Sequence, residues 1–239
     1  MGDQSAPARL LLFDIDGTLL DTGGAGRNAI IKAFCDTFAI TPDNAPPIDL
    51  HGATDSGVAH DLFDARQIDR TPENLQAFFD TYLTELTRHL EHIHTDGTLL
   101  SGVNHLLDTI RSETPHVCAL LTGNIQRGAF IKLKHYGIDH HFQTGAFGDD
   151  HHDRDQLGPI ARQRANDLHN LNVTFENTIV IGDTPKDIRC ARACGAQVIA
   201  VATGAFSAEE LSSHQPDHLF ESLSSTKDFL TAINTSISP

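Results

Sequence analysis

The apolar residues of this chain gather in short continuous runs, and each run ends in polar, turn-forming residues. The runs span Leu10–Phe13, Val117–Leu121 and 178–181, and a fourth follows at 198–202. Runs of this length are typical of strands that are covered on both faces, as in a parallel sheet. A further apparent strand spans 142–147.

Apolar residues at helical spacing separate these runs. They mark helices around 103–110, within 160–168 and around 188–193. Strands that alternate with helices predict an α/β fold with a doubly wound, Rossmann-like parallel-sheet core. Ligands bind at the carboxyl ends of the strands in such a core. We therefore expect the polar clusters that end the runs to lie together.

The alternation is interrupted after the first strand. Apolar residues follow helical spacing around 30–38 and again around 75–90, without a clear strand. We predict an α/β core domain of 1–20 and 98–239, with a helical cap domain of 21–97 inserted into it. The glycine-rich entry to this insert suits the hinges of a lid, although a fixed helical layer would show the same pattern.

Charge and composition exclude several classes of partner. Seventeen Lys and Arg against 32 Asp and Glu give a net charge of −15, which disfavours nucleic acid and anionic membrane surfaces. No apolar run approaches the ~20 residues of a membrane span, and the first residues do not resemble a signal peptide. We expect a cytoplasmic protein whose four cysteines, without CxxC spacing, are reduced and mostly buried.

Fifteen histidines are many for a chain of this size. Three pairs, at 92/94, 140/141 and 151/152, fall in polar, loop-like sequence. Solvated imidazoles are the expectation for these pairs, and metal binding is the less favoured alternative.

The first apolar run ends in two carboxylates, within LLFDIDGTLL. If the chain is still extended, Asp14 and Asp16 lie on the same face and repel unless a cation or a shared proton separates them. Asp14 suits a nucleophile that forms an aspartyl phosphate, and Asp16 suits the acid and base of the two steps. Gly17 permits a sharp turn beside a ligand, and Thr18 offers a hydroxyl. An Asx turn without chemistry is the alternative.

Two later clusters suit phosphate and metal binding. In LLTGN, the Thr122 hydroxyl and the backbone of the following turn at Gly123 and Asn124 suit a phosphate. In GDTPKD, the proline fits the first position of a helix, which puts Asp183 before the helix and Asp187 in its first turn. Carboxylate oxygens there suit Mg²⁺. Taken singly, each cluster is also ordinary turn or helix-start chemistry.

Combining the clusters creates a charge problem. A phosphate monoester adds ~2 negative charges, and each like pair of unit charges at ~4 Å repels by about 4 kcal/mol at an effective dielectric of about 20. A divalent cation and a basic side chain are needed. We choose Arg154, which lies between the apparent strand at 142–147 and a helix. The other candidates fall within helices, where we expect solvated positions: Arg127, Lys132, Lys134, Arg162 and Arg164.

The ordered set DIDGTLL, LLTGN and GDTPKD resembles the haloacid dehalogenase superfamily, and more narrowly its phosphoglycolate phosphatase-like members, over nearly the whole chain. The resemblance implies that Asp14 is the nucleophile and a Mg²⁺ ligand. It implies that Asp16 is the acid/base and binds the ion through its backbone carbonyl. It also implies that Asp183 completes the metal site and that Asp187 belongs to it, directly or through other ligands.

The same resemblance implies phosphate binding by Thr122. The chain departs from the family because its third motif has no lysine, and we assign that role to Arg154, since a guanidinium holds phosphate through two parallel bonds. The insert carries no substrate signature. Its stretch HGATDS at 51–56 either lines the pocket or, through Asp55, caps the next helix.

We therefore predict a Mg²⁺-dependent phosphatase that hydrolyses a small phosphorylated metabolite through an aspartyl phosphate. Two alternatives stay open: a phosphomutase with the same catalytic set, and a catalytically silent ligand-binding or regulatory protein. The dehalogenases lack the second aspartate, so Asp16 argues against that branch. A phosphonate-cleaving relative needs a Schiff-base lysine, for which the insert offers only Lys32. The sequence predicts neither the substrate nor the oligomeric state.

Overall fold

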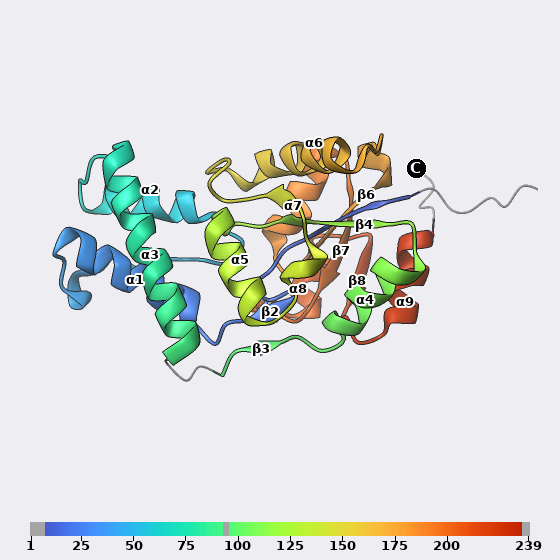
Figure 1. The fold of residues 1–239 in the computed structure, drawn as a ribbon, viewed down its shortest axis with the longest axis horizontal. Coiled ribbons are helices and arrows are strands. Elements are labelled where there is room, and N and C mark those ends of the chain that lie inside the picture. Colours follow the sequence, from blue (N-terminus) through green and yellow to red (C-terminus); the bar gives the residue numbers. More distant parts are fainter. Residues whose placement is uncertain (1–7, 93–95, 236–239) are drawn as a thin grey trace, which may run out of the picture.

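A six-stranded parallel sheet forms the centre of the molecule (Figure 1). The structure is a computed structural model that describes residues 8–92 and 96–235. The sheet has the order β5-β4-β1-β6-β7-β8. Its strands are β1 (Leu10–Phe13), β4 (Val117–Leu121), β5 (Gly145–Ala146), β6 (Thr178–Gly182), β7 (Gln197–Val201) and β8 (His218–Phe220).

The register of the three central strands brings their ends to one level. Leu10 in β1 lies beside Val117 in β4 and Thr178 in β6, and Phe13 lies beside Leu120 and Ile181. Because these strands are parallel, the polar residues that follow them meet at the same edge of the sheet. This register is the physical reason why the polar clusters converge at that edge.

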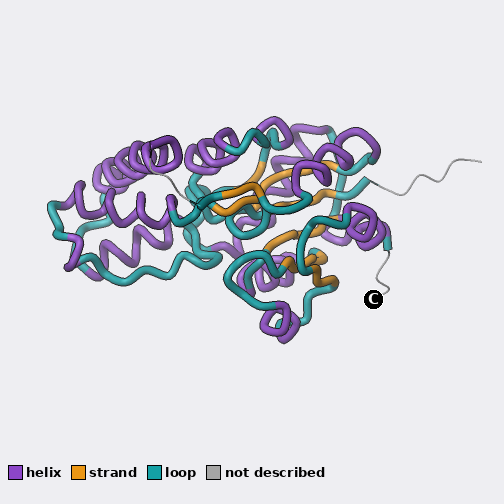
Figure 2. Tube along the Cα trace, turned by 90° about the horizontal axis from the view of Figure 1, so that it is seen from below, coloured by secondary structure: helices purple, strands orange, loops and turns teal. Residues whose placement is uncertain are grey.

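Helices cover both faces of the sheet (Figure 2). Leu11 and Phe13 pack on one face, with apolar residues of α4 (Val103–Glu113), α5 (Gln126–His135) and α9 (Thr226–Asn234). Leu10 and Leu12 pack on the other, with α6 (Leu157–His169), α7 (Pro185–Cys194) and α8 (Ala208–Ser213). A strand buried on both sides has no polar face, which explains the unbroken apolar runs. The predicted doubly wound α/β core is confirmed.

Three helices between β1 and β4 form a separate apolar cluster. They are α1 (Ala25–Phe38), α2 (Asp55–Ala65) and α3 (Pro72–His92), and the rings of Phe34, Phe63 and Phe78 contact one another among them. The chain enters and leaves this region through a short antiparallel pair, β2 (Leu20–Asp21) and β3 (Thr98–Leu99). We refer to α1–α3 and their connections as the cap; its boundaries at 21 and 97 stay a prediction.

Some elements differ from the sequence prediction. The apparent strand at 142–147 is reduced to β5, because a 3₁₀ turn, η2 (Asp139–His141), precedes it. The pair β2–β3 was not predicted, since two-residue strands leave no alternating pattern. Three further 3₁₀ turns are η1 (Pro42–Asn44), η3 (Arg154–Gln156) and η4 (Phe175–Asn177).

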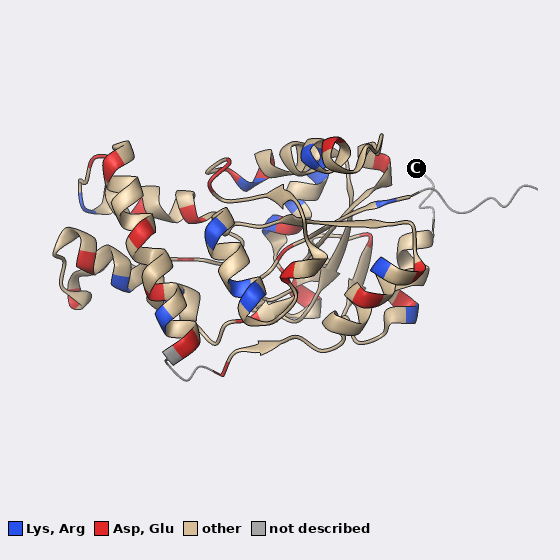
Figure 3. Ribbon diagram, viewed as in Figure 1, with Lys and Arg blue, Asp and Glu red and all other residues tan. Residues whose placement is uncertain are grey.

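Basic and acidic residues are interspersed along the helices (Figure 3). Within the described residues, no helix has the combination of length and apolar character that crossing a bilayer requires. The longest, α3, has 21 residues and carries five charged ones: Glu73, Asp80, Glu85, Arg88 and Glu91.

Candidate active site

Three carboxylates meet where β1 and β6 end. Asp14 follows β1 directly, Asp183 follows β6, and Asp187 lies in the first turn of α7. One carboxylate oxygen from each lies within 4.8 Å of the others, and all three residues are buried. The structure thus brings together Asp14, Asp183 and Asp187, which are separated by up to 173 positions in the sequence.

The pKa values of two of these carboxyls reflect the crowding. Burial, with repulsion from Asp187 and Asp16, raises the pKa of Asp14 to about 6 against the opposing effect of Arg154. Burial, together with Asp14 and Asp187, holds the pKa of Asp183 well above its usual range. Hard carboxylate oxygens grouped in this way are the donor set that Mg²⁺ takes. A divalent cation among them would favour the ionised forms, so these residues fit the predicted ion.

Two glycines, Gly17 and Gly204, pack so closely against the Asp183 side chain that neither position has room for a Cβ atom. A Cβ added at Gly204 would lie 1.7 Å from Asp183 Oδ2, and one at Gly17 would lie 2.3 Å from the same atom. Gly17 also has φ +83°, a conformation that favours glycine. The Thr18 hydroxyl donates a hydrogen bond of 3.0 Å to Asp183 Oδ1. Gly17 and Thr18, predicted to bind substrate, therefore surround a candidate metal ligand.

Arg154 lies between two of the carboxylates. Its Nη2 is 3.0 Å from Asp14 Oδ1 and also contacts Asp187 Oδ1, and only 4% of the residue is exposed. Burial alone would lower the pKa of Arg154, but Asp187 and Asp14 outweigh it and raise the value. The Nε of Arg154 is buried without a hydrogen-bond partner among the described residues. The guanidinium therefore neutralises carboxylate charge and keeps a donor for an anionic ligand.

Asp187 also stabilises the start of helix α7, in addition to its place in the carboxylate cluster. Its Oδ2 accepts hydrogen bonds from the backbone N–H and the hydroxyl of Thr184, 3.0 and 2.7 Å long, in a capping box at the start of α7. Its Oδ1 accepts from Arg154. Because both oxygens have partners, Asp187 orients Arg154 and the turn that follows Asp183.

Asp16 belongs to a different arrangement from the three carboxylates. The Nζ of Lys132 contacts both of its oxygens, at 2.8 and 2.7 Å, and Asn124 Nδ2 donates to Oδ2 at 2.7 Å. Lys132 Nζ also donates to Asn124 Oδ1 at 2.6 Å. Lys132 is 4% exposed, whereas the Asp16 side chain is 40% exposed. The pair of Lys132 and Asn124 therefore fixes a carboxylate that faces the open part of the site.

The prediction that Lys132 is solvated was wrong. It lies on α5, which also carries Arg127 and Lys134, and both of those are exposed. The residue at 132 falls one helical turn after buried Ala129 and beside buried Leu133, so it shares the inward face. The helical position of Lys132 relative to these two apolar residues was the signal that sequence reasoning missed.

Thr122 and the turn after β4 complete the edge of the site. The Thr122 hydroxyl is fully buried and accepts hydrogen bonds from the backbone N–H and side-chain Nδ2 of Asn124. Its own hydrogen has no acceptor among the described residues, which leaves a donor for a ligand. A Cβ at Gly123 would lie 1.8 Å from Ala53 O, so Gly123 allows the cap to approach.

The cap closes over these residues and forms a cavity of about 260 Å³. Asp55, the first residue of α2, donates its backbone N–H to Gly123 O at 2.7 Å, and its carboxylate accepts from Ile125 N at 2.8 Å. The Thr54 hydroxyl donates to His152 O at 2.5 Å and also caps α2. Thus Thr54, not Asp55, is the N-cap residue of helix α2. The stretch at 51–56 contributes four residues to the cavity wall: His51, Gly52, Ala53 and Asp55.

Comparisons with known proteins identify the family to which the chain belongs. The family described as haloacid dehalogenase-like hydrolase matches residues 11–201. The chain belongs to this family. Pyrophosphatase PpaX of Anoxybacillus flavithermus is 27% identical over 90% of this chain and 93% of its own. Phosphoglycolate phosphatase of Aliivibrio fischeri is 25% identical over 87% of this chain and 90% of its own.

Solved structures show the same fold. A hydrolase from Pseudomonas syringae superposes with a TM-score of 0.69 at 21% identity, over 95% of this chain and all of the other. Family and relatives confirm two predictions from the sequence: the chain is a haloacid dehalogenase-like protein, and it is an enzyme, a phosphatase.

Proposed function

We propose that this haloacid dehalogenase-like phosphatase is Mg²⁺-dependent and hydrolyses a small phosphorylated metabolite through an aspartyl phosphate on Asp14. One observation carries the proposal: Asp14 and Asp183 present oxygens within 4.8 Å of each other at one edge of the sheet, beside an Asp16 carboxylate that Lys132 and Asn124 hold. The cavity of about 260 Å³ above them suits a small substrate.

Asp14, Asp183 and the backbone carbonyl of Asp16 would hold Mg²⁺, and Asp187 would act through Arg154 because both of its oxygens have partners. The ion supplies positive charge that stabilises the phosphoryl group during its transfer. Arg154 Nε and the Thr122 hydroxyl supply donors for phosphoryl oxygens. These donors reduce the repulsion between an anionic substrate and the carboxylates.

The chemistry then follows in two steps. An oxygen of Asp14 attacks phosphorus, the bond from phosphorus to the leaving oxygen breaks, and Asp16, which enters this step protonated, gives its proton to that oxygen. Water then attacks the phosphorus of the aspartyl phosphate and gives its proton to Asp16, and the bond from phosphorus to Asp14 breaks. Inorganic phosphate leaves, and both carboxyls return to their starting states.

Arg27 on α1 indicates the class of substrate. It lines the cavity, it is exposed, and no ion pair engages it among the described residues, unlike Lys132 and Arg154. The two relatives are named for pyrophosphate and phosphoglycolate, which both carry a second anionic group. We therefore propose a substrate with a second phosphate or a carboxylate, which Arg27 would bind.

The four cysteines carry no disulfide, and burial raises the pKa of Cys118 and of Cys190 to about 12. Such thiols suit a reducing compartment, and we propose the cytoplasm.

Replacement of the nucleophile tests the proposal. Asp14→Asn should lower Mg²⁺-dependent hydrolysis of an aryl phosphate by about 10³-fold or more, because an amide cannot form the aspartyl phosphate. Asp36→Asn, an exposed change on α1, is the matched control and should keep full activity. Undiminished turnover by Asp14→Asn would refute the assignment. Release of inorganic phosphate without isomerisation of sugar phosphates would separate a phosphatase from a phosphomutase.

A further inference from the structure

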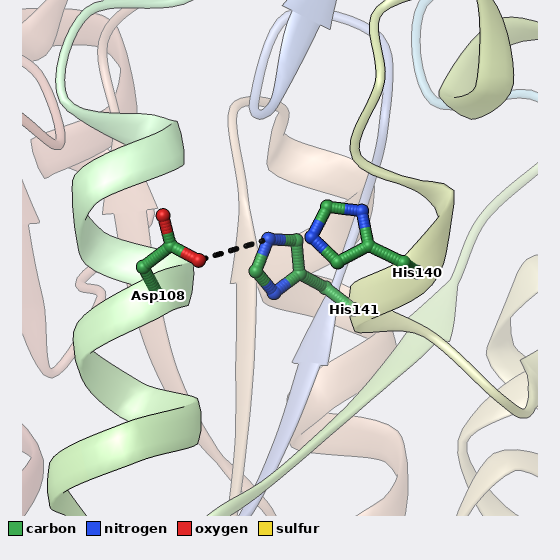
Figure 4. Close-up of side chains that lie close together, drawn as sticks. All are labelled: Asp108, His140 and His141. Carbon is green, nitrogen blue, oxygen red and sulfur yellow. Dashed lines mark ion pairs between the residues drawn. The ribbon is translucent and has the colours of Figure 1, made fainter.

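A second group of metal-ligating side chains lies away from the cavity. Asp108 on α4 and the adjacent His140 and His141 in η2 each offer one ligand atom, all within 4.8 Å of one another. Figure 4 shows both imidazoles extending from η2 toward the carboxylate on α4. None of the three lines the cavity of the active site.

His141 is not the solvated residue that the sequence predicted. Its side chain is 2% exposed, and neither Nδ1 nor Nε2 has a hydrogen-bond partner among the described residues. A buried polar group without a partner is costly, and such groups in native proteins usually indicate a bound water or ion. Of the other pairs, His151 is half-buried, His152 is exposed and His94 lies outside the described residues.

The spacing between His141 and Asp108 suits an ion better than a direct contact. Nε2 lies 3.7 Å from Asp108 Oδ1 (dashed in Figure 4), which is beyond the ~2.7–3.2 Å of a hydrogen bond. Zinc binds imidazole nitrogen at about 2.0–2.1 Å and carboxylate oxygen at about 2.0–2.2 Å, which places the two ligand atoms about 3.4 Å apart at a tetrahedral angle. A side-chain shift of a few tenths of an ångström closes that difference.

The surroundings of His141 favour its neutral imidazole, which is the form that binds a metal ion. Burial, then His140, lowers the pKa of His141, against the opposing effect of Asp108. The ring of His140 lies 4.0 Å from that of His141, centroid to centroid. Arg111 is the competitor: its Nη2 lies 3.8 Å from the same Asp108 oxygen, although its side chain is 59% exposed and free to move away.

We propose that Asp108, His140 and His141 bind one divalent transition-metal ion of the zinc class. Two imidazoles and a carboxylate suit zinc, nickel or copper rather than Mg²⁺, so this site would not compete with the active site for its ion. Three protein ligands leave a fourth position for water. The ion would fasten η2, and with it the connection from α5 to β5, to the middle of α4.

Zinc titration tests the site in the Asp183→Asn protein, in which the candidate catalytic metal site is weakened, with excess Mg²⁺ present. This parent should bind Zn²⁺ at one site, and adding His140→Ala or Asp108→Asn should weaken that affinity at least tenfold. Arg111→Gln should tighten it several-fold, because a competing cation is removed. His214→Ala, which removes an exposed imidazole on the other face of the sheet, is the control and should change nothing.

A second readout does not involve catalysis. Zn²⁺ should raise the midpoint of thermal unfolding of the parent but not of the His140→Ala protein. The His140 side chain is exposed, so its replacement should leave the fold unaffected. Equal Zn²⁺ affinity in the parent, His140→Ala and Asp108→Asn proteins would overturn the proposal, and so would an absence of binding in the parent. Neither outcome bears on Asp14 as the nucleophile.

Discussion

Among the described residues, Lys132 and Arg154 are the buried cations that line the cavity, and each is surrounded by oxygen acceptors. Lys132 contacts Asp16 and Asn124, and Arg154 contacts Asp14 and Asp187. A buried charge is tolerated only when it is paired and hydrogen-bonded, so each cation and its carboxylates depend on one another. Removal of Lys132 should therefore disturb Asp16, whereas removal of Arg154 should disturb Asp14 and Asp187.

Lys132→Met should lower kcat by about 10–100-fold, because the Asp16 carboxylate loses the ammonium that orients it. Since Lys132 does not contact the three-carboxylate cluster, KM for Mg²⁺ should change little. Steady-state kinetics over a range of Mg²⁺ concentrations would measure both. Lys134→Met, an exposed change on the same helix, is the control; equal kcat in the two variants would show that Lys132 has no part in catalysis.

Arg154→Met should lower kcat by about 10²-fold or more, because a donor to the transferring phosphoryl group is lost. It should also destabilise the protein by ~3–5 kcal/mol, since two buried carboxylates lose their partner. Hydrolysis assays and urea unfolding would check the two effects. Arg189→Met removes an exposed arginine of α7 that pairs with Asp155 and should do neither. A normal rate in Arg154→Met would assign phosphate binding to another residue.

The aspartates of the site could be predicted from the sequence, but not all of their partners could. Asp14, Asp183 and Asp187 follow strands whose ends are visible as the ends of apolar runs, so their meeting could be predicted. Lys132 could not be separated from the other helical cations by composition, because its burial depends on which face of α5 turns inward. The pairing of Asn124 with Asp16 depends on side-chain rotation, which spacing does not specify.

Among the elements, the start of α2 connects the cap to the turn after β4. The Asp55 carboxylate accepts from Ile125 N, and its backbone N–H donates to Gly123 O. Burial raises the pKa of Asp55 from 3.8 to about 6, opposed by Lys132 and by the hydrogen bond from Ile125. Folding therefore favours the protonated form of Asp55 relative to the unfolded chain, and ionisation of this residue costs stability.

Asp55→Asn should change how stability depends on pH. The cost of ionising Asp55 is absent below pH ~4, grows as pH rises to about 6 and is constant above, where it reaches ~3 kcal/mol for about two pKa units. The variant lacks this cost, so its stability relative to wild type should increase between pH 4 and 6. Denaturant unfolding at several pH values would measure the difference. Asp61→Asn, exposed on the same helix, should show no such trend.

The long elements could be predicted, and the short ones could not. The strands β1, β4, β6 and β7 and the helices α1, α3 and α4 have enough residues for their periodicity to show. Strands of two residues, such as β2, β3 and β5, are defined by pairing with neighbours far away in sequence. The N-cap of helix α2 is Thr54, one position before the Asp55 that the sequence suggested, since both residue types are suitable N-caps.

Across the whole molecule, the sheet and the cap contribute different things to the cavity. Asp14, Asp16, Thr122 and Asp183 come from the turns that follow strands and Arg154 comes from η3, whereas Arg27, Ile30, Ile48, Leu50 and 51–53 come from the cap. The region between β1 and β4 was predicted to be helical from the spacing of its apolar residues. Its contribution to the cavity was only suspected at 51–56, because docking of one region on another leaves no periodic signal.

Arg27→Gln should raise KM about tenfold for substrates with a second anionic group, since one cation–anion contact is worth ~1–2 kcal/mol in a partly buried site. An aryl phosphate without such a group should be hydrolysed with unchanged KM. Comparing the two substrate types in steady state would give the answer. Lys32→Gln on the same helix, where Lys32 pairs with Asp36 at the surface, is the matched control. A uniform change for both substrates would exclude selective recognition.

The separate origins of the cavity walls have a consequence for how this protein can be modified. Replacing side chains on α1 or in the connection before α2 alters the shape and charge presented to the far end of a bound molecule, while the proposed nucleophile Asp14 and its cationic neighbours Arg154 and Lys132 lie outside the cap. A library confined to those positions would redirect the enzyme to other metabolites and would leave its bond-breaking machinery intact.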